Sequence, residues 1–246
     1  MKTVALILAG GVGSRMGADI PKQFLTVYDK PIIVYTLERF QSHPEIDSIG
    51  VVCVHGWEDV VRGYREDYGI DKLDWVITGG DSYLASIREG IYHLEGELAP
   101  EDVVVVHNSV QPILGAEIIT DAVRVARRYG SGVSATPYND QLYFVDDEDP
   151  TTTTSPIERS KLRRVTTPNA YQFGCIDETY RRIEREGTDI SGVSGICVMM
   201  ALTGTRLHFS AGSDRNIKIT NKDDMVVFKA YLNDNELAPG RGETRE

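Results

Sequence analysis

Apolar residues along the chain recur in two alternating patterns. Short runs rich in valine and isoleucine occupy residues 4–9, 49–54, 75–77, 103–107 and 132–136. Between them lie longer segments whose apolar residues follow helical spacing, at residues 32–40, 60–68, 84–94 and 118–129. Short apolar runs that alternate with amphipathic helices are typical of parallel strands joined by crossover helices. Residues up to about 135 therefore predict an α/β fold with a mostly parallel sheet.

The alternation stops near residue 138. Residues 138–156 contain an acidic cluster, four consecutive threonines and two prolines, so no parallel strand with its helix fits there. We expect an extended arm or a loop in this segment. Beyond it, the pattern predicts helices at residues 173–185, 195–202 and 223–232 and a strand at 206–210. We expect one domain over residues 1–232 and a flexible polar tail over residues 233–246.

Composition excludes several classes of function. The 246 residues include 37 acidic and 26 basic side chains, and the formal net charge of −11 disfavours general nucleic-acid binding and a basic membrane-surface module. The first apolar run is too short for a membrane span and ends in glycines, so we expect neither a membrane segment nor a signal peptide. The three widely spaced cysteines form no metal-binding pattern, and reduced thiols in a cytoplasmic protein are expected.

The strongest local motif follows the first predicted strand. Its sequence, LAGGVGSRMG over residues 8–17, places four glycines in eight positions, which lets backbone N–H groups approach an anion. Arg15 within the loop and Lys22 shortly after it add two cations. This combination suits a triphosphate.

Other glycine-rich loops match the segment less well. A Walker loop requires Gly-Lys-Ser/Thr, which is absent from the chain. A dinucleotide loop has the spacing G-x-G-x-x-G, feeds a helix directly and is followed by an acidic residue at the end of the second strand. Here the spacing is longer, Pro21 interrupts a helix, and the second strand leads into His55. A strand–helix turn without function is the remaining alternative.

Three segments together resemble a known family. LAGGVGSRMG (8–17), PKQFL (21–25) and PIIVYTLERF (31–40) are similar to the cytidylyltransferases that act on polyol phosphates, such as 2-C-methyl-D-erythritol 4-phosphate and ribitol 5-phosphate. The resemblance implies a Rossmann-like, GT-A-like nucleotidyltransferase fold in three layers, with CTP and Mg2+ as requirements. It also implies a homodimer clasped by an extended β-arm, here about residues 138–165. In the implied reaction an acceptor phosphate oxygen attacks the α-phosphorus of CTP and pyrophosphate leaves.

The resemblance also implies roles for individual residues. The cations expected to stabilise the phosphates during the reaction are Arg15, Lys22 and Lys218. The residues expected to bind the nucleotide are Ala9, Gly10, Gly11, Gly13, Gly80 and Ser86, and those expected near the acceptor are Arg159, Thr188 and Asp189. Three of these side chains have an alternative, because Ser86 could be a solvated serine in a first helical turn and Arg159 or Lys218 a surface cation.

Several positions depart from the family pattern. The family's HDA(A/V)RP segment reads His107-Asn108-Ser109-Val110-Gln111-Pro112 here, so the expected metal-binding aspartate is Asn108 and the arginine is Gln111. A further arginine of the family corresponds to Tyr83. Asn108 is the expected metal-side residue, although an amide oxygen is a weaker Mg2+ ligand than a carboxylate.

Two hypotheses for the function follow from these motifs. The first is a CTP-dependent enzyme that forms a CDP-polyol or CDP-sugar from a small polyol or sugar phosphate, with residues 195–200 favouring the pentitol-phosphate branch. The second is a catalytically weak CTP-binding regulatory homologue. Charge is distributed in favour of anion binding, because residues 1–30, 157–164 and 206–222 carry +2, +3 and +3 while the remainder carries −19.

Overall fold

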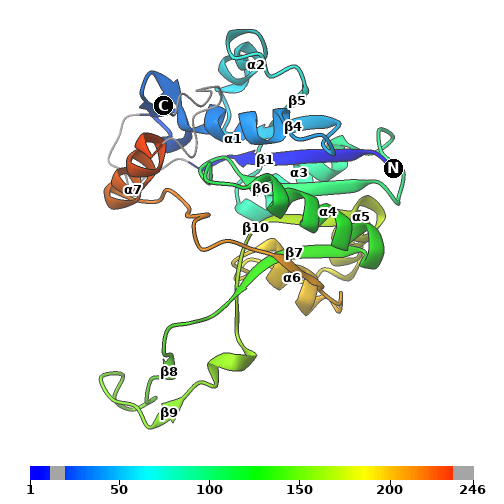
Figure 1. Ribbon diagram of the computed structural model, residues 1–246. Helices are drawn as coiled ribbons and strands as arrows, with labels where there is room; N and C mark the ends of the chain where they lie inside the picture. The colour runs from blue at the N-terminus through cyan, green and yellow to red at the C-terminus, as the bar shows by residue number, and fades with distance from the viewer. Residues whose placement is uncertain (12–19, 235–246) are drawn as a thin grey trace.

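A seven-stranded sheet forms the centre of the computed structural model, which describes residues 1–11 and 20–234 (Figure 1). The strand order is β11-β7-β10-β6-β1-β4-β5. The strands are β1 (Thr3–Ala9), β4 (Ser48–Cys53), β5 (Leu73–Thr78), β6 (Val103–Asn108), β7 (Ser131–Pro137), β10 (Arg163–Gln172) and β11 (Phe209–Ala211). All neighbours pair in parallel except β10, which runs antiparallel to both β6 and β7.

Helices cover both faces of this sheet. They are α1 (Ile32–Gln41), α2 (Glu58–Asp67), α3 (Tyr83–His93), α4 (Ala116–Tyr129), α5 (Phe173–Glu186), α6 (Ile196–Leu202) and α7 (Lys222–Asn233). Helices α1, α2 and α4 share one buried core with the sheet, and α3, α5 and α6 share the other. Strand β1 is buried along its whole length because alternate side chains enter opposite cores, Ile7 on one side and Leu6 on the other. The three-layer, mostly parallel α/β fold expected from the sequence is therefore confirmed.

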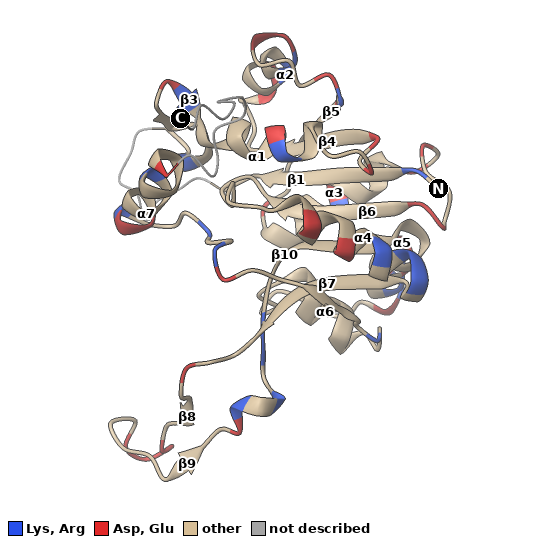
Figure 2. Ribbon diagram, in the orientation of Figure 1, with Lys and Arg blue, Asp and Glu red and all other residues tan. Residues whose placement is uncertain are grey.

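Helix α7 packs outside these two cores. Phe228 on α7 is fully buried in a third cluster with Ile32, Tyr35 and Ile219, and its ring meets that of Tyr35 edge to face at 5.3 Å. Through Ile219, this cluster fixes the segment before α7 against the carboxyl end of the sheet. Charged residues lie mainly on the helices and loops, whereas the central strands carry few (Figure 2).

The sequence patterns located most elements but missed β10. The predicted strands at 4–9, 49–54, 75–77, 103–107 and 132–136 all exist, and the strand predicted at 206–210 forms at Phe209–Ala211. No strand was expected at Arg163–Gln172, since that segment begins with two arginines and contains Pro168. The register between β10 and β7 shifts between Val165 and Asn169, which accommodates the proline.

The segment after β7 leaves the body of the molecule and returns through β10 (Figure 1). It contains the short hairpin β8 (Tyr143–Phe144) and β9 (Ser155–Pro156), followed by the 3-10 turn η3 (Arg159–Lys161). Of the two alternatives, extended arm or loop, the structure has an extended arm. A second 3-10 turn, η2 (Lys22–Phe24), and the hairpin of β2 (Thr26–Val27) and β3 (Lys30–Pro31) precede α1. None of the helices in the described part of the chain is long and apolar enough to cross a membrane.

Candidate functional site

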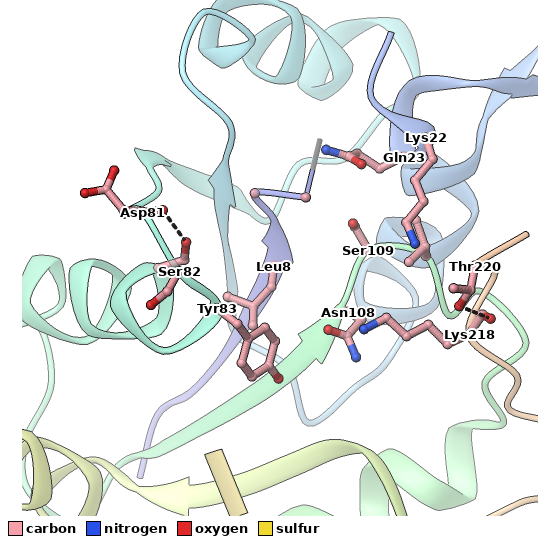
Figure 3. A pocket seen from close by; sticks show the side chains of 15 residues that line it. Leu8, Lys22, Gln23, Asp81, Ser82, Tyr83, Asn108, Ser109, Lys218 and Thr220 are labelled. Carbon is pink, nitrogen blue, oxygen red and sulfur yellow. Dashed lines mark hydrogen bonds between the residues drawn. The ribbon is translucent and has the colours of Figure 1, made fainter. Parts of the chain in front are cut away.

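A cavity of about 420 Å3 opens at the carboxyl ends of β1 and β6 (Figure 3). The carboxyl edge of parallel strands is where α/β sheets bind ligands, because loops diverge there and leave a crevice. The lining side chains and backbone come from five segments, namely Leu8, Gly10 and Gly11; Lys22 and Gln23; Gly80, Asp81, Ser82, Tyr83 and Ser86; Asn108, Ser109 and Val110; and Lys218 and Thr220.

Lys22 and Gln23 are fixed by hydrogen bonds across the cavity mouth. The Gln23 amide donates to the carbonyl oxygen of Ala9 at 2.6 Å, and the Lys22 ammonium donates to the carbonyl oxygen of Ile219 at 3.0 Å. Both side chains are buried, Lys22 at 9% exposure. The two bonds hold the 3-10 turn between the end of β1 and the segment that carries Lys218. Two lysines distant in sequence thereby line one cavity.

Ser86 packs between two glycines at the start of α3. A Cβ on Gly79 would lie 2.9 Å from the Ser86 hydroxyl, and one on Gly10 would lie 3.2 Å from it, so larger residues would collide there. The hydroxyl donates to the carbonyl oxygen of Gly80 at 3.2 Å. Ser82 caps the helix by accepting the N–H of Ala85 at 3.1 Å. Ser86 is 5% exposed, so the alternative of a solvated helix serine is wrong.

Asn108 belongs to a buried network of neutral side chains. Its amide donates to the Gln111 side-chain oxygen at 2.5 Å, and the Thr167 hydroxyl donates to that same oxygen at 2.9 Å. Gln111 in turn donates to the Asn216 side-chain oxygen at 3.4 Å, and the Asn216 amide donates to the carbonyl oxygen of Thr167. All four side chains are at least nine-tenths buried. An amide pair thus stands where the resemblance implies an aspartate and an arginine.

His107 is fully buried in the core and is joined to this network through the backbone of Gln111. Its Nε2 donates to the carbonyl oxygen of Gln111 at 3.0 Å, while its buried Nδ1 has no hydrogen-bond partner among the described residues. Complete burial lowers the pKa of His107 to about 4, since a charged imidazole is poorly solvated there. His107 is therefore neutral at physiological pH, and its hydrogen bond helps to fix the backbone of Gln111.

The electrostatics of the cavity favour an anion. Figure 3 shows the Lys218 side chain extending toward Asn108, with Lys22 pointing into the same space, whereas the carboxylate of Asp81 points away from both. Asp81 is the single acidic residue among those described around the cavity. Two cations with a distant carboxylate can stabilise the negative charge of a triphosphate.

The described residues do not fit a magnesium ion held by the protein itself. No group of three histidine, cysteine, aspartate or glutamate side chains gathers as a metal site within residues 1–11 and 20–234. At the metal-side position, Asn108 uses its amide N–H to bond Gln111 and can offer an ion one neutral oxygen. Such a donor suits an ion whose other ligands are phosphate oxygens and water.

A second cavity, of about 860 Å3, adjoins the first and shares Tyr83, Asn108 and Lys218 with it. One side is apolar, formed by α6 and β11, with Ile196, Cys197, Val198, Ala201, Leu202 and Phe209 among the lining residues. Tyr83 stands in the wall between the two spaces, and burial raises the pKa of its phenol. The phenol therefore stays protonated and can donate a hydrogen bond.

The structure brings together most, but not all, of the residues expected from the sequence. Gly10, Gly11, Lys22, Gly80, Ser86, Asn108 and Lys218 line the first cavity. Ala9 does not line the cavity itself, but its carbonyl oxygen accepts a hydrogen bond from the side-chain amide of Gln23, which does. Gly13 and Arg15 fall outside the described residues.

The three acceptor-side residues line neither cavity. The Arg159 guanidinium donates to the carbonyl oxygen of Asn139 within the arm at 2.8 Å. Thr188 and Asp189 lie exposed beyond α5, where Asp189 accepts the N–H of Ser191 at 2.9 Å and that bond lowers the pKa of its carboxyl group. Their predicted roles would therefore need a neighbouring subunit or a change of position.

Sequence reasoning missed several members of the site. Gln23 follows Lys22 directly, and its position could have been suspected from that neighbour. Asn216 lies two residues before Lys218 in the same motif, so it too could have been suspected, whereas Thr167 meets the Asn108–Gln111 pair only through the tertiary fold.

Comparison with known proteins gives a consistent result. The family profile described as IspD, 2-C-methyl-D-erythritol 4-phosphate cytidylyltransferase, matches residues 3–234. A ribitol-5-phosphate cytidylyltransferase of Lacticaseibacillus paracasei is 42% identical over 95% of this chain and 99% of its own. A 2-C-methyl-D-erythritol 4-phosphate cytidylyltransferase of Alkaliphilus metalliredigens is 30% identical over 94% of this chain and 93% of its own. The solved structure of the latter enzyme from Thermus thermophilus shares the fold, with a TM-score of 0.72 at 23% identity over 95% of this chain and 100% of that one.

Proposed function

Because this chain belongs to the 2-C-methyl-D-erythritol 4-phosphate cytidylyltransferase family, we propose that it transfers CMP from CTP to the phosphate of ribitol 5-phosphate or a closely similar polyol phosphate. The observation that carries the proposal is the pair of lysines, Lys22 and Lys218, in one cavity with the glycine backbone at the end of β1. The cytidylyltransferase activity itself follows from membership of the family. The choice of acceptor rests on the higher identity to relatives named for ribitol 5-phosphate, 42% and 36% against 30% and 31%.

The reaction needs positioning and charge stabilisation more than covalent help from the protein. An acceptor phosphate oxygen forms a bond to the α-phosphorus of CTP, the bond between that phosphorus and the bridging oxygen breaks, and pyrophosphate leaves. In the proposal Lys22 and Lys218 balance the negative charge that builds up on the phosphates. Arg15 and the N–H groups around Gly13 act with them, and Gly10, Gly11, Gly80 and Ser86 hold the nucleoside.

We propose that Mg2+ enters the site bound to CTP. CTP at physiological Mg2+ carries the ion on its phosphate oxygens, and Mg2+ retains several waters in such complexes. Asn108 would then contribute one carbonyl oxygen or a water contact, which agrees with its lack of a carboxylate.

We further propose a homodimer in which the arm of one subunit reaches the acceptor site of the other. Tyr143, Phe144 and Val145 on the arm are 51–64% exposed in the single chain, an apolar group that a second subunit would cover. Arg159 on the same arm would then approach the partner's acceptor phosphate, with Thr188 and Asp189 near the polyol. A cytoplasmic location is part of the proposal, because Cys53, Cys175 and Cys197 form no disulfide.

A pyrophosphate-release assay tests the activity. We expect turnover with CTP and ribitol 5-phosphate in the presence of Mg2+, and much less with ATP, GTP or UTP. Lys218→Met should reduce kcat/KM by about 100-fold or more, as for loss of one charge-stabilising group. Lys222→Met is the matched control, since Lys222 is exposed at the start of α7 and lines neither cavity. Absence of turnover with CTP and every member of a broad polyol-phosphate panel would contradict the proposal.

The neutral pair at Asn108 and Gln111 favours one alternative function, a CTP-binding regulatory protein with little catalysis. Asn108→Asp and the double variant Asn108→Asp/Gln111→Arg separate the two possibilities. If the native chain binds CTP but turns over only after these changes, the regulatory function is correct. If the native chain already turns over and the variants gain little, the enzymatic function is correct.

A further inference from the structure

The second cavity has a charge pattern that the first does not explain. Its described lining includes two cations, Arg164 and Lys218, and no carboxylate. The polar residues between them, Asn108, Gln111 and Asn216, are neutral. A concave space with two cations and no acid favours an anion. Since Lys218 also lines the nucleotide cavity, an anion bound here would lie next to the phosphates of CTP.

Arg164 is held in place for such a ligand. It lies on β10, and its Nη1 donates to the Asp214 carboxylate at 3.0 Å. The same carboxylate oxygen accepts the hydroxyl of Thr136 on β7 at 3.1 Å. This anchor uses one donor of a guanidinium that has five, so others can meet a phosphate. The guanidinium side chain is 39% exposed, and it therefore remains accessible to a ligand in the cavity.

Neighbouring residues on β10 show that this placement is specific. Arg163 directly precedes Arg164 on the same strand. Arg163 donates to the carbonyl oxygens of Ser160 and Leu162 at 3.2 and 2.8 Å and does not line the cavity. Arg164 therefore lines the cavity and Arg163 does not, although the two residues are adjacent on one strand and have the same side chain.

We propose that Arg164 binds the acceptor phosphate from within the same subunit, together with Lys218. The inference rests on the proposed CMP transfer and adds a residue to it. Arg164 supplies planar N–H donors, which suit the oxygens of a phosphate monoester, and Lys218 supplies a point charge between acceptor and nucleotide. Asp214 is a positioning residue, because it orients the guanidinium without meeting the ligand.

Steady-state kinetics with separately varied substrates test the proposal. Arg164→Ala should raise the KM for ribitol 5-phosphate by about tenfold or more, while the KM for CTP stays within about twofold. Arg164→Lys should recover part of the loss, and Arg163→Ala should leave both values unchanged. Asp214→Asn keeps the guanidinium but loosens its anchor, so a smaller rise in the same KM is expected.

Binding of inorganic phosphate, measured by calorimetry, provides a readout that needs no turnover. We expect Arg164→Ala to weaken phosphate binding by about tenfold relative to Arg163→Ala. If phosphate binding and the acceptor KM are the same in the two variants, the assignment of Arg164 is wrong. If the native chain transfers no CMP but phosphate binding still depends on Arg164, the proposed function fails and the anion site stands.

Discussion

The amide pair of Asn108 and Gln111 makes a prediction about stability that can be worked out from its geometry. The Asn108 N–H donates to the Gln111 oxygen at 2.5 Å in a buried setting. Asn108→Asp replaces that donor by a carboxylate oxygen that faces the Gln111 oxygen. We expect a loss of about 2–3 kcal/mol in the free energy of unfolding, the usual range for leaving buried polar groups unpaired.

The change at the other residue of the pair, Gln111→Arg, is expected to lower the free energy of unfolding by a similar amount. Gln111→Arg removes the acceptor used by both Asn108 and Thr167 and places an unpaired guanidinium in the core. An uncompensated buried charge costs about 3 kcal/mol. In the double variant the new carboxylate and guanidinium would form an ion pair in the same position. The pair should recover about 2–3 kcal/mol relative to the sum of the single changes.

Urea unfolding of the four proteins near neutral pH measures this coupling as a double-mutant cycle. Asn139→Asp, on the exposed arm, adds the same charge and should change the free energy of unfolding by less than about 0.5 kcal/mol. Additivity of the two single changes within about 0.5 kcal/mol would refute the idea that the amide pair occupies the position of an ion pair.

Three further measurements test other parts of the structure. Since burial lowers the pKa of His107 to about 4 from 6.5, the unfolded chain takes up a proton that the folded chain does not. Urea titrations should show stability falling by about 3 kcal/mol as pH drops from 6.5 to 4, with a shallower fall in His107→Gln; equal slopes would contradict the assignment. Gly132→Ala would place its Cβ against the backbone carbonyl of Ala122 on α4. We expect the free energy of unfolding, measured by thermal denaturation, to fall by at least about 2 kcal/mol. A Cβ on Gly192 would have no atom within 4 Å, so Gly192→Ala should leave the melting temperature nearly unchanged. Equal melting temperatures for the two variants would refute the packing argument. Lys22→Met should lower kcat/KM for CMP transfer by about 100-fold or more, and unchanged kinetics would remove Lys22 from the charge-stabilising group.

Periodicity located the parallel part of the sheet because its central strands, β1, β4 and β6, are buried on both faces. A strand such as Val103–Asn108 has four consecutive valines, a local signal that needs no knowledge of its neighbours. Strand β10 lacks this signal, because its sequence, RRVTTPNAYQ, contains few apolar residues. Thr167 and Asn169 are buried polar residues within it. Their environment depends on residues far away along the chain, and a local pattern cannot express that dependence.

The motifs located the residues that line the first cavity better than those that line the second. Gly10, Gly11 and Lys22 follow one strand closely, so sequence spacing fixes their proximity. The second cavity is assembled from β10, α6 and the segment before α7, which meet only in the folded chain. Arg164 illustrates the difference, because the sequence shows two adjacent arginines and gives no indication of which one faces the cavity.

The placement of Lys22 explains how a chain with a net charge of −11 can bind a triphosphate. Exposed charges separated by more than about 8 Å are largely screened at physiological ionic strength, so most of the acidic surface exerts little force inside the cavity. Lys22 is 9% exposed, and a partly buried charge interacts through a lower effective dielectric constant than one in water. The local field is therefore set by Lys22 and Lys218 while the surface remains acidic. Added salt should then weaken CTP binding less than it would weaken binding to a surface cluster of lysines, and a steep salt dependence of the CTP Kd would contradict this account.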